Sequence, residues 1–366
     1  MSNTAYIKHE SCALNNSNIV IDCHISNDCG LSNEAYLNFE MDLYFKEHPT
    51  INTLEFLNKQ AILQSVSMSQ ISINGSMFCL DNDVLRYLKK FKNFEFSNFK
   101  INNNSDLTIE QFETEPNKIK LKWSEPIYHP SFLFNEVFKR ELIGPIECYL
   151  SIALRPDEDL LLNSFISDCG CPINFEILNT SMLTKTLKSQ NIPRQMRLPL
   201  YDNYKSPIGH LTNYTLVKSK SQGITLRSTP HKLFVFAFQK NPSYHSNFTS
   251  IKNLKLRINN EICVFKNTTP LILYNMAKKN GYDGDFNTWK NHSICCFDFC
   301  KDLNFHNNID DHNRIDISAE IKHQCTISAE YELCFIVEYT GFYYKDSKDK
   351  DRYNYSVRNH PCSLID

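Results

Sequence analysis

The sequence has few glycines, almost no net charge and no long apolar run. Nine glycines in 366 residues are too few for collagen-like repeats or glycine-rich linkers. A formal net charge of −2 with dispersed basic residues gives no electrostatic footprint for sequence-specific nucleic-acid binding. No run approaches the roughly 18 apolar residues that span a bilayer, so we expect no membrane insertion. The remaining class is a globular protein with packed cores.

Signals of secretion and of common catalytic classes are also missing. The start, MSNTAYIKHE, has no apolar segment after a basic region, so we expect no signal peptide. The sequence contains no G-x-S-x-G elbow, no glycine-rich phosphate loop and no H-E-x-x-H zinc motif. We therefore predict that the chain is not an enzyme and uses no cofactor.

Cysteine, in contrast, is abundant. The 14 cysteines stand in a chain without a secretion signal, which predicts reduced, intracellular thiols. The stretch SICCFDFC, residues 293–300, contains Cys295, Cys296 and Cys300. The spacing of Cys296 and Cys300 suits half of a zinc site, but no second pair is spaced to complete it. We expect no metal and a role as small core residues, because a free cysteine packs like a small hydrophobe.

Two other polar stretches are candidate sites. Cys169 and Cys171 in DCGCP are too close for a zinc knuckle and are placed to form a tight turn with reactive thiols. In FHNNIDDH the candidate ligands of a divalent ion are His306, Asp310, Asp311 and His312, with Asp302 nearby. A polar loop between two strands also explains that stretch, and we favour it. We therefore predict no catalytic, cofactor-binding or metal residues.

Hydrophobic periodicity predicts a chain built mainly of strands. In YLNFEMDLYF, every second residue from Leu37 to Phe45 is apolar, which is the period of a half-buried strand. The stretch TTPLILYNMAKKNG predicts a helix over 270–280, with a threonine cap, Pro270 in the first turn and Gly281 after the end. A second helix is expected from residue 81 to Phe91. The expected strands are 36–45, 118–123, 148–154, 232–238, 253–258, 293–299, 314–321 and 332–339.

The strands fall into two series separated by an extended stretch with little periodicity. Short strands at this spacing favour two antiparallel sandwiches on one chain. The predicted organisation is an N-terminal arm or edge strand, a first sandwich, a connection, a second sandwich and a polar tail. Their ranges are 1–33, 34–185, 186–204, 205–345 and 346–366.

The second half resembles the double jelly-roll major capsid proteins of polinton/Maverick elements and of adintovirus-like or virophage-like small DNA viruses. The resemblance depends on the order of several features rather than on one motif. A Pro-x-x-Leu strand begins at Pro230, a helix ends in Asn280 and Gly281, Trp289 follows, and an apolar strand then leads into an Asp-Leu pair at Asp302. It covers about residues 200–345 well. Weaker similarity lies in GPIECYLSIALRPDEDLL and IPRQMRLPLYDNY.

The resemblance implies an all-β fold of two antiparallel eight-stranded jelly rolls side by side, each with a short helix. It implies a structural protein that trimerises into pseudo-hexameric capsomers and tiles an icosahedral shell. The implied partners are other copies of the chain and a vertex (penton) capsid protein. The implied location is the virion capsid, with synthesis and assembly inside the host cell, in the nucleus or the cytoplasm.

Two other functions remain open from the sequence. One is a monomeric jelly-roll binding module for a glycan or a protein, which would show an exposed aromatic platform on a concave sheet. The other is an enzyme with a dispersed site around His306, Asp310 and His312, which would show a pocket with convergent polar groups.

Overall fold

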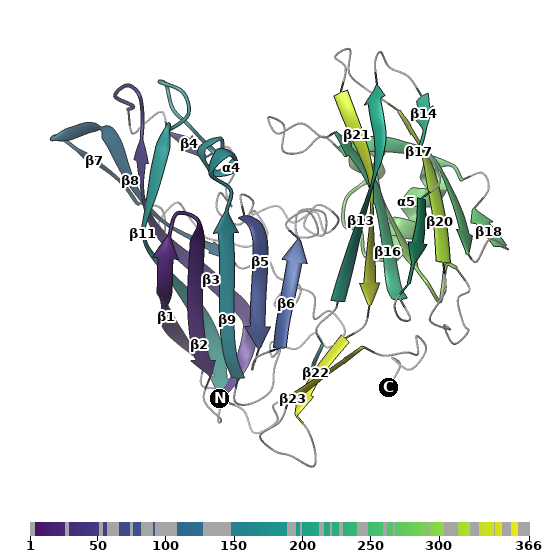
Figure 1. The fold of residues 1–366 in the computed structure, drawn as a ribbon, viewed down its shortest axis with the longest axis horizontal. Helices are drawn as coiled ribbons and strands as arrows, with labels where there is room; N and C mark the ends of the chain where they lie inside the picture. The colour runs from purple at the N-terminus through teal and green to yellow at the C-terminus, as the bar shows by residue number, and fades with distance from the viewer. Residues whose placement is uncertain are drawn as a thin grey trace. The chain divides into compact units, whose positions relative to one another are not determined.

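The fold is described from a computed structural model of the chain. The residues described are 4–25, 29–50, 54–56, 66–73, 76–81, 91, 108–126, 148–188, 195–197, 200–211, 216–219, 222–226, 230–239, 248–258, 262–265, 268–291, 293–303, 314–322, 329–339, 341–345 and 353–357. They are mainly β-strands, arranged in two compact units (Figure 1). None of the helices in these residues is long and apolar enough to cross a membrane.

The first unit comprises residues 1–86, 95–198 and 342–355. Nine of its strands form one antiparallel path in the order β6-β5-β9-β2-β1-β11-β3-β8-β7 (Figure 1). The bounds of these strands are β1 Thr4–Asn15, β2 Asn18–Ile25, β3 Cys29–Tyr44, β5 Val66–Ile73, β6 Ser76–Asp81, β7 Thr108–Phe112, β8 Glu115–Pro126, β9 Cys148–Pro156 and β11 Asn174–Lys188.

Strand β1 belongs to both sheets of this sandwich. Residues Thr4 to Glu10 pair with β11, and residues from Ser11 onwards pair with β2 after a change of register. The core between the sheets follows the period of two, because alternate residues of a strand point to the same face. The buried apolar residues of four core-forming strands are Leu37, Phe39, Met41, Leu43, Ile119, Leu121, Trp123, Ile19, Ile21, Cys23, Ile152 and Leu154.

Short elements complete the first unit. Helix α4 spans Glu158–Leu162, and β4 (Glu55–Phe56) pairs with β10 (Phe165–Ile166). A separate three-stranded sheet has the order β12-β22-β23, with β12 at Gln195–Arg197, β22 at Gly341–Lys345 and β23 at Tyr353–Val357.

The second unit comprises residues 87–94, 199–341 and 356–366. Strands β13, β21, β16 and β19 lie next to one another in one sheet, and β18, β17, β20, β14 and β15 form the other. Strand β17 also pairs with β16, so it connects the two sheets. The bounds are β13 Leu200–Leu211, β14 Leu216–Lys218, β15 Gln222–Thr225, β16 Pro230–Gln239, β17 Phe248–Ile258, β18 Ile262–Phe265, β19 Ile294–Asp298, β20 Arg314–Lys322 and β21 Ala329–Tyr339.

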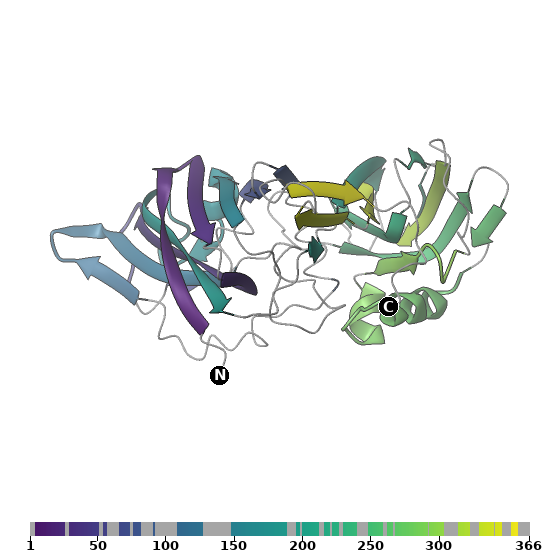
Figure 2. The ribbon, with the colours of Figure 1, turned by 90° about the horizontal axis from the view of Figure 1, so that it is seen from below.

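Two helices pack on one side of the strands of this unit, namely α5 (Pro270–Lys279) and α6 (Phe286–Asn291) (Figure 2). Helix α5 lies against β19, and α6 lies against β17. The predicted helix at 270–280 is therefore present, with Thr269 as its cap. The antiparallel, mostly β architecture confirms the predicted fold class.

A short segment from the first half of the sequence belongs to the second unit. Phe91 is helical and only 2% exposed. Its ring centroid lies 5.2 Å from that of Phe234 in an edge contact and 5.8 Å from that of Tyr282. Asp81, where the helix was expected to start, is the last residue of β6, and residues 82–90 lie outside the described residues.

The chain organisation differs from the expected one at three places. Residues 4–25, expected as an N-terminal arm or edge strand, form β1 and β2 within the sheets of the first unit. The two units divide between Leu198 and Pro199, and strands β11, β12 and β13 take up much of the expected connection at 186–204. Part of the expected polar tail forms β23, which pairs with β22.

Candidate functional site

Two of the residues that carry the family resemblance, Asn280 and Asp302, come together at the end of helix α5. The side-chain nitrogen of Asn280 donates to the Asp302 carboxylate at 2.6 Å and to the carbonyl of Cys296 at 3.0 Å. The same carboxylate accepts the backbone N–H of Asp298 at 2.9 Å and pairs with Lys279 at 3.1 Å. Because the side chain of Asp302 is only 3% exposed, these contacts offset the cost of burying its charge.

Gly281 and Trp289 complete this cluster. Gly281 has a φ of 102°, a conformation that lets the chain turn directly after α5 and that side-chain-bearing residues rarely adopt. Trp289 is fully buried on α6, and its indole N–H donates to the carbonyl of Ile294 at 2.8 Å. The motif therefore fixes two helices to β19, and its residues have a structural role rather than a catalytic one.

The cysteine-rich stretch lies in the core of the second unit. Cys295 and Cys296 are both fully buried in β19, where they point to opposite faces of the strand. Burial raises the pKa of both thiols well above its usual range. Both residues therefore pack in the core as small apolar side chains.

The described part of the chain contains no group of three or more His, Cys, Asp or Glu residues placed to hold a metal ion. The residues of FHNNIDDH, namely His306, Asp310, Asp311 and His312, lie outside the described residues. Asp302 is described, and its carboxylate is engaged in the cluster at the end of α5. Asp285 caps α6 by accepting the backbone N–H of Thr288 at 2.7 Å, which lowers the pKa of its carboxyl.

A group of polar side chains around the buried Glu338, which no sequence motif indicates, lies on β13, β16 and β21. His231 Nδ1 lies 2.7 Å from Glu338 Oε1, and the hydroxyl of Tyr201 donates to the other carboxylate oxygen at 2.9 Å. The side chain of Glu338 is 9% exposed, so it depends on these partners. In the sequence, Glu338 lies more than 100 positions from both His231 and Tyr201. No local pattern links the three residues.

The outer face of the sheet formed by β1, β11, β3, β8 and β7 is a ladder of opposite charges. Lys120 and Lys122 on β8 both pair with Glu40 on β3, at 3.1 and 3.7 Å. Lys118 pairs with the buried Asp42 at 2.9 Å and with Glu115 at 3.1 Å. These bonds raise the pKa of the Lys118 ammonium. The charges on this face neutralise one another, so it does not form a patch of a single sign.

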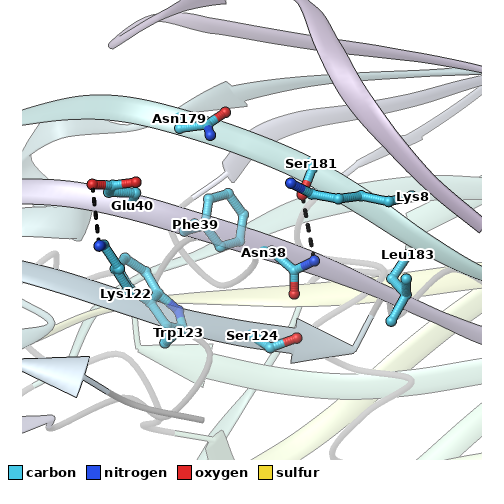
Figure 3. Close-up of a pocket in the computed structure, with 10 residues that line it drawn as sticks. All are labelled: Lys8, Asn38, Phe39, Glu40, Lys122, Trp123, Ser124, Asn179, Ser181 and Leu183. Carbon is cyan, nitrogen blue, oxygen red and sulfur yellow. Dashed lines mark hydrogen bonds and ion pairs between the residues drawn. The ribbon is translucent and has the colours of Figure 1, made fainter.

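A shallow hollow of about 470 Å³ lies on this outer face, where the side chains in the middle of the sheet are short (Figure 3). Asn38, Ser124 and Ser181 line it, with Asn38 donating to Ser181 at 3.4 Å, and Lys8 and Lys122 stand at its sides. The aromatic residues next to it, Phe39 and Trp123, are 3% and 8% exposed. The hollow therefore offers no aromatic surface on which a sugar ring could stack.

Comparisons with known proteins agree with the fold. The family model described as the major capsid protein V20 C-terminal domain matches residues 208–294. A comparison with curated protein sequences finds no match.

Solved structures from viruses share the fold over almost the whole chain. The structure of the Sputnik virophage has a chain with a TM-score of 0.73 and 14% identity, covering 97% of this chain and 88% of that one. For the mavirus major capsid protein the TM-score is 0.66 and the sequence identity is 13%, and the match covers 98% of this chain and 92% of that one. For VP54 of PBCV-1 the TM-score is 0.59 and the sequence identity is 11%, and the match covers 98% of both chains. The protein thus has the double jelly-roll fold of viral major capsid proteins, and residues 208–294 match the C-terminal domain of one such family.

Proposed function

We propose that this protein is a structural major capsid protein. The observation that carries the proposal is that the likeness to the mavirus major capsid protein extends over 98% of this chain and 92% of that one. Both jelly rolls are thus included, together with the connection between them. The independent family match at residues 208–294 includes the helix-turn motif of α5.

In this role the chain associates with further copies of itself. Three two-lobed subunits around a threefold axis give six lobes, and the resulting hexagonal block tiles the faces of an icosahedral shell. Contacts between trimers, and contacts with a vertex (penton) protein, close the shell. The place of action is the virion, after synthesis and assembly inside the host cell.

The composition of the chain is compatible with close tiling. A net charge of −2 creates little repulsion between neighbouring copies. The opposite charges of the ladder on the outer face of the first unit largely offset one another, so it can face another protein surface without a large electrostatic cost. No catalytic step, cofactor, membrane insertion or sequence-specific nucleic-acid contact is needed for this function.

A monomeric binding module for a glycan or a protein is the competing function. A glycan-binding sheet would present exposed aromatic rings, whereas the aromatic residues beside the described hollow are buried. Tyr6 is 53% exposed and belongs to β1, outside the set of residues that line the hollow. The observations therefore favour the capsid role.

Negative-stain electron microscopy of the purified full-length chain tests this proposal. We expect class averages with threefold symmetry and a roughly hexagonal outline. Separate two-lobed particles without symmetry, at the same protein concentration, would contradict the capsid role and support the binding module.

A further inference from the structure

Cys169 and Cys171 are the only cysteines in the sequence separated by one residue, and they lie in a tight turn. Ser167 and Gly170 exchange two backbone hydrogen bonds, of 2.9 and 3.0 Å, which close the turn around Cys169. Gly170 has a φ of 100°, so the chain bends sharply between the two cysteines. This left-handed conformation is readily available to glycine and rarely to other residues.

The turn brings the two cysteines within reach of a disulfide. Two successive Cα–Cα steps of about 3.8 Å span at most about 7.6 Å, and any bend shortens that distance. A disulfide needs Cα atoms about 4.4–6.8 Å apart. The bend at Gly170 therefore shortens the distance between the two Cα atoms towards this range.

Both thiols are free and accessible to solvent, whereas the thiols of the core are free but buried. Cys171 is exposed, and Cys169 is partly exposed. The Cys169 thiol lies 3.0 Å from the hydroxyl of Ser167 and donates to the carbonyl of Glu47 at 3.5 Å. A small oxidant can therefore reach this pair, whereas the thiols of Cys295 and Cys296 are enclosed by side chains.

We propose that Cys169 and Cys171 form a redox-modifiable dithiol site, which a low-molecular-weight disulfide converts to an intramolecular disulfide. The site is independent of the capsid role, because it needs only the turn of the first unit. It is also distinct from a metal site, since two thiolates separated by one residue supply only half of a tetrahedral zinc sphere.

The reaction proceeds by two thiol–disulfide exchanges. The thiolate of Cys171, the more exposed residue, attacks a sulfur of glutathione disulfide and releases one glutathione thiolate. The thiolate of Cys169 then attacks the sulfur of Cys171 in the mixed disulfide and releases the second glutathione. The two protein thiols lose two electrons and two protons, and glutathione disulfide becomes two glutathione thiols.

Disulfide formation alters the contacts of the Cys169 thiol with the Ser167 hydroxyl and with the Glu47 carbonyl. The Cys169 thiol gives up its proton and with it the contact to the Glu47 carbonyl. The carboxylate of Asp168 still accepts the backbone N–H and the hydroxyl of Thr50, at 3.3 and 3.5 Å. The oxidised turn therefore remains attached to the segment after β3, and oxidation does not require the first unit to unfold.

The test is mass spectrometry of the folded, full-length protein after incubation with glutathione disulfide. Free thiols are blocked, and cleavage after Asp168 and Glu176 releases residues 169–176, whose only cysteines are this pair. We expect this peptide to lose two hydrogen atoms and to carry neither blocking group nor glutathione. Reduction should restore two blockable thiols.

Two controls make the result specific. Cys171→Ser should leave Cys169 able to form only a mixed disulfide with glutathione. Cys12 is an exposed cysteine whose thiol faces the Val20 carbonyl and Asp22, so it should also stop at the mixed disulfide. Finding the pair unmodified, only glutathionylated, or linked to another cysteine would overturn the proposal, whatever the oligomeric state of the protein.

Discussion

Phe91 should stabilise the second jelly roll although it comes from the first half of the sequence. Its ring is 2% exposed and packs against Phe234 and Tyr282, both within the second unit. Phe91→Ala removes these contacts and leaves a cavity. Truncation of a buried phenylalanine costs about 3–5 kcal/mol in the free energy of unfolding.

Buried cysteines allow each unit to be followed separately during unfolding. Cys23 reports on the first unit, and Cys295 and Cys296 report on the second, since all three are fully buried. Pulsed alkylation along a urea series, read by mass spectrometry, gives a midpoint for each reporter. With an m-value of about 2 kcal/mol per molar, Phe91→Ala should lower the midpoint of the second unit by about 2 M.

The matched control is Tyr6→Ala, which truncates an aromatic residue that is 53% exposed. Its effect should stay within about 0.5 kcal/mol, as for other surface substitutions. All variants are compared at one protein concentration, because association shifts apparent stability. An unchanged midpoint for Cys295 in Phe91→Ala, or a shift in the midpoint of Cys23 alone, would contradict this role of Phe91.

Three further predictions concern single side chains. Asp302→Ala should destabilise the second unit by about 1–3 kcal/mol because it leaves the buried side-chain amide of Asn280 without its acceptor, whereas exposed Asp283→Ala should have little effect in the same urea assay. Burial lowers the pKa of His9 in the folded state below its usual value of 6.5. The unfolded chain therefore binds a proton more readily than the folded one, and the free energy of unfolding falls as the pH decreases below 6.5. His9→Gln should therefore flatten thermal stability measured between about pH 5 and pH 7. In the folded protein, a thiol reagent should modify Cys12 and leave Cys295 unmodified, and equal labelling would contradict the buried assignment.

The sequence predicts those strands and helices whose formation depends on neighbouring residues. The alternation from Leu37 to Phe45 corresponds to β3, and the caps Thr269 and Gly281 enclose α5. In both cases neighbouring residues carry the information, either through a period of two or through the needs of a helix end. The order of the motif residues around Trp289 also identified the fold.

The first strand was not recognisable from its own residues. Strand β1 lies in the middle of its sheet path, but its inward positions include His9, which bonds the hydroxyl of Thr184 at 3.0 Å. Its outward positions, such as Lys8 and Glu10, form an exposed ion pair. A strand whose two faces are both partly polar has weak alternation, and its partner on β11 is more than 150 residues away.

Two features of the second unit could not be predicted for a related reason. One is the packing of Phe91 in its core, and the other is the group formed by His231, Tyr201 and Glu338. Their contacts join segments that are distant in the sequence, and no spacing rule connects them. Such contacts follow from the tertiary fold. The local pattern of apolar and polar residues predicts the fold class but not these individual contacts.

The mass of the purified chain in solution, measured along a dilution series by light scattering or native mass spectrometry, tests the capsid proposal most directly. Permanent interfaces bury about 2,000 Å² or more, and closed symmetry is the usual outcome for such homo-oligomers. We predict a species of three 42.7 kDa chains that persists into the sub-micromolar range. A stable, folded monomer at micromolar concentration would contradict the proposal.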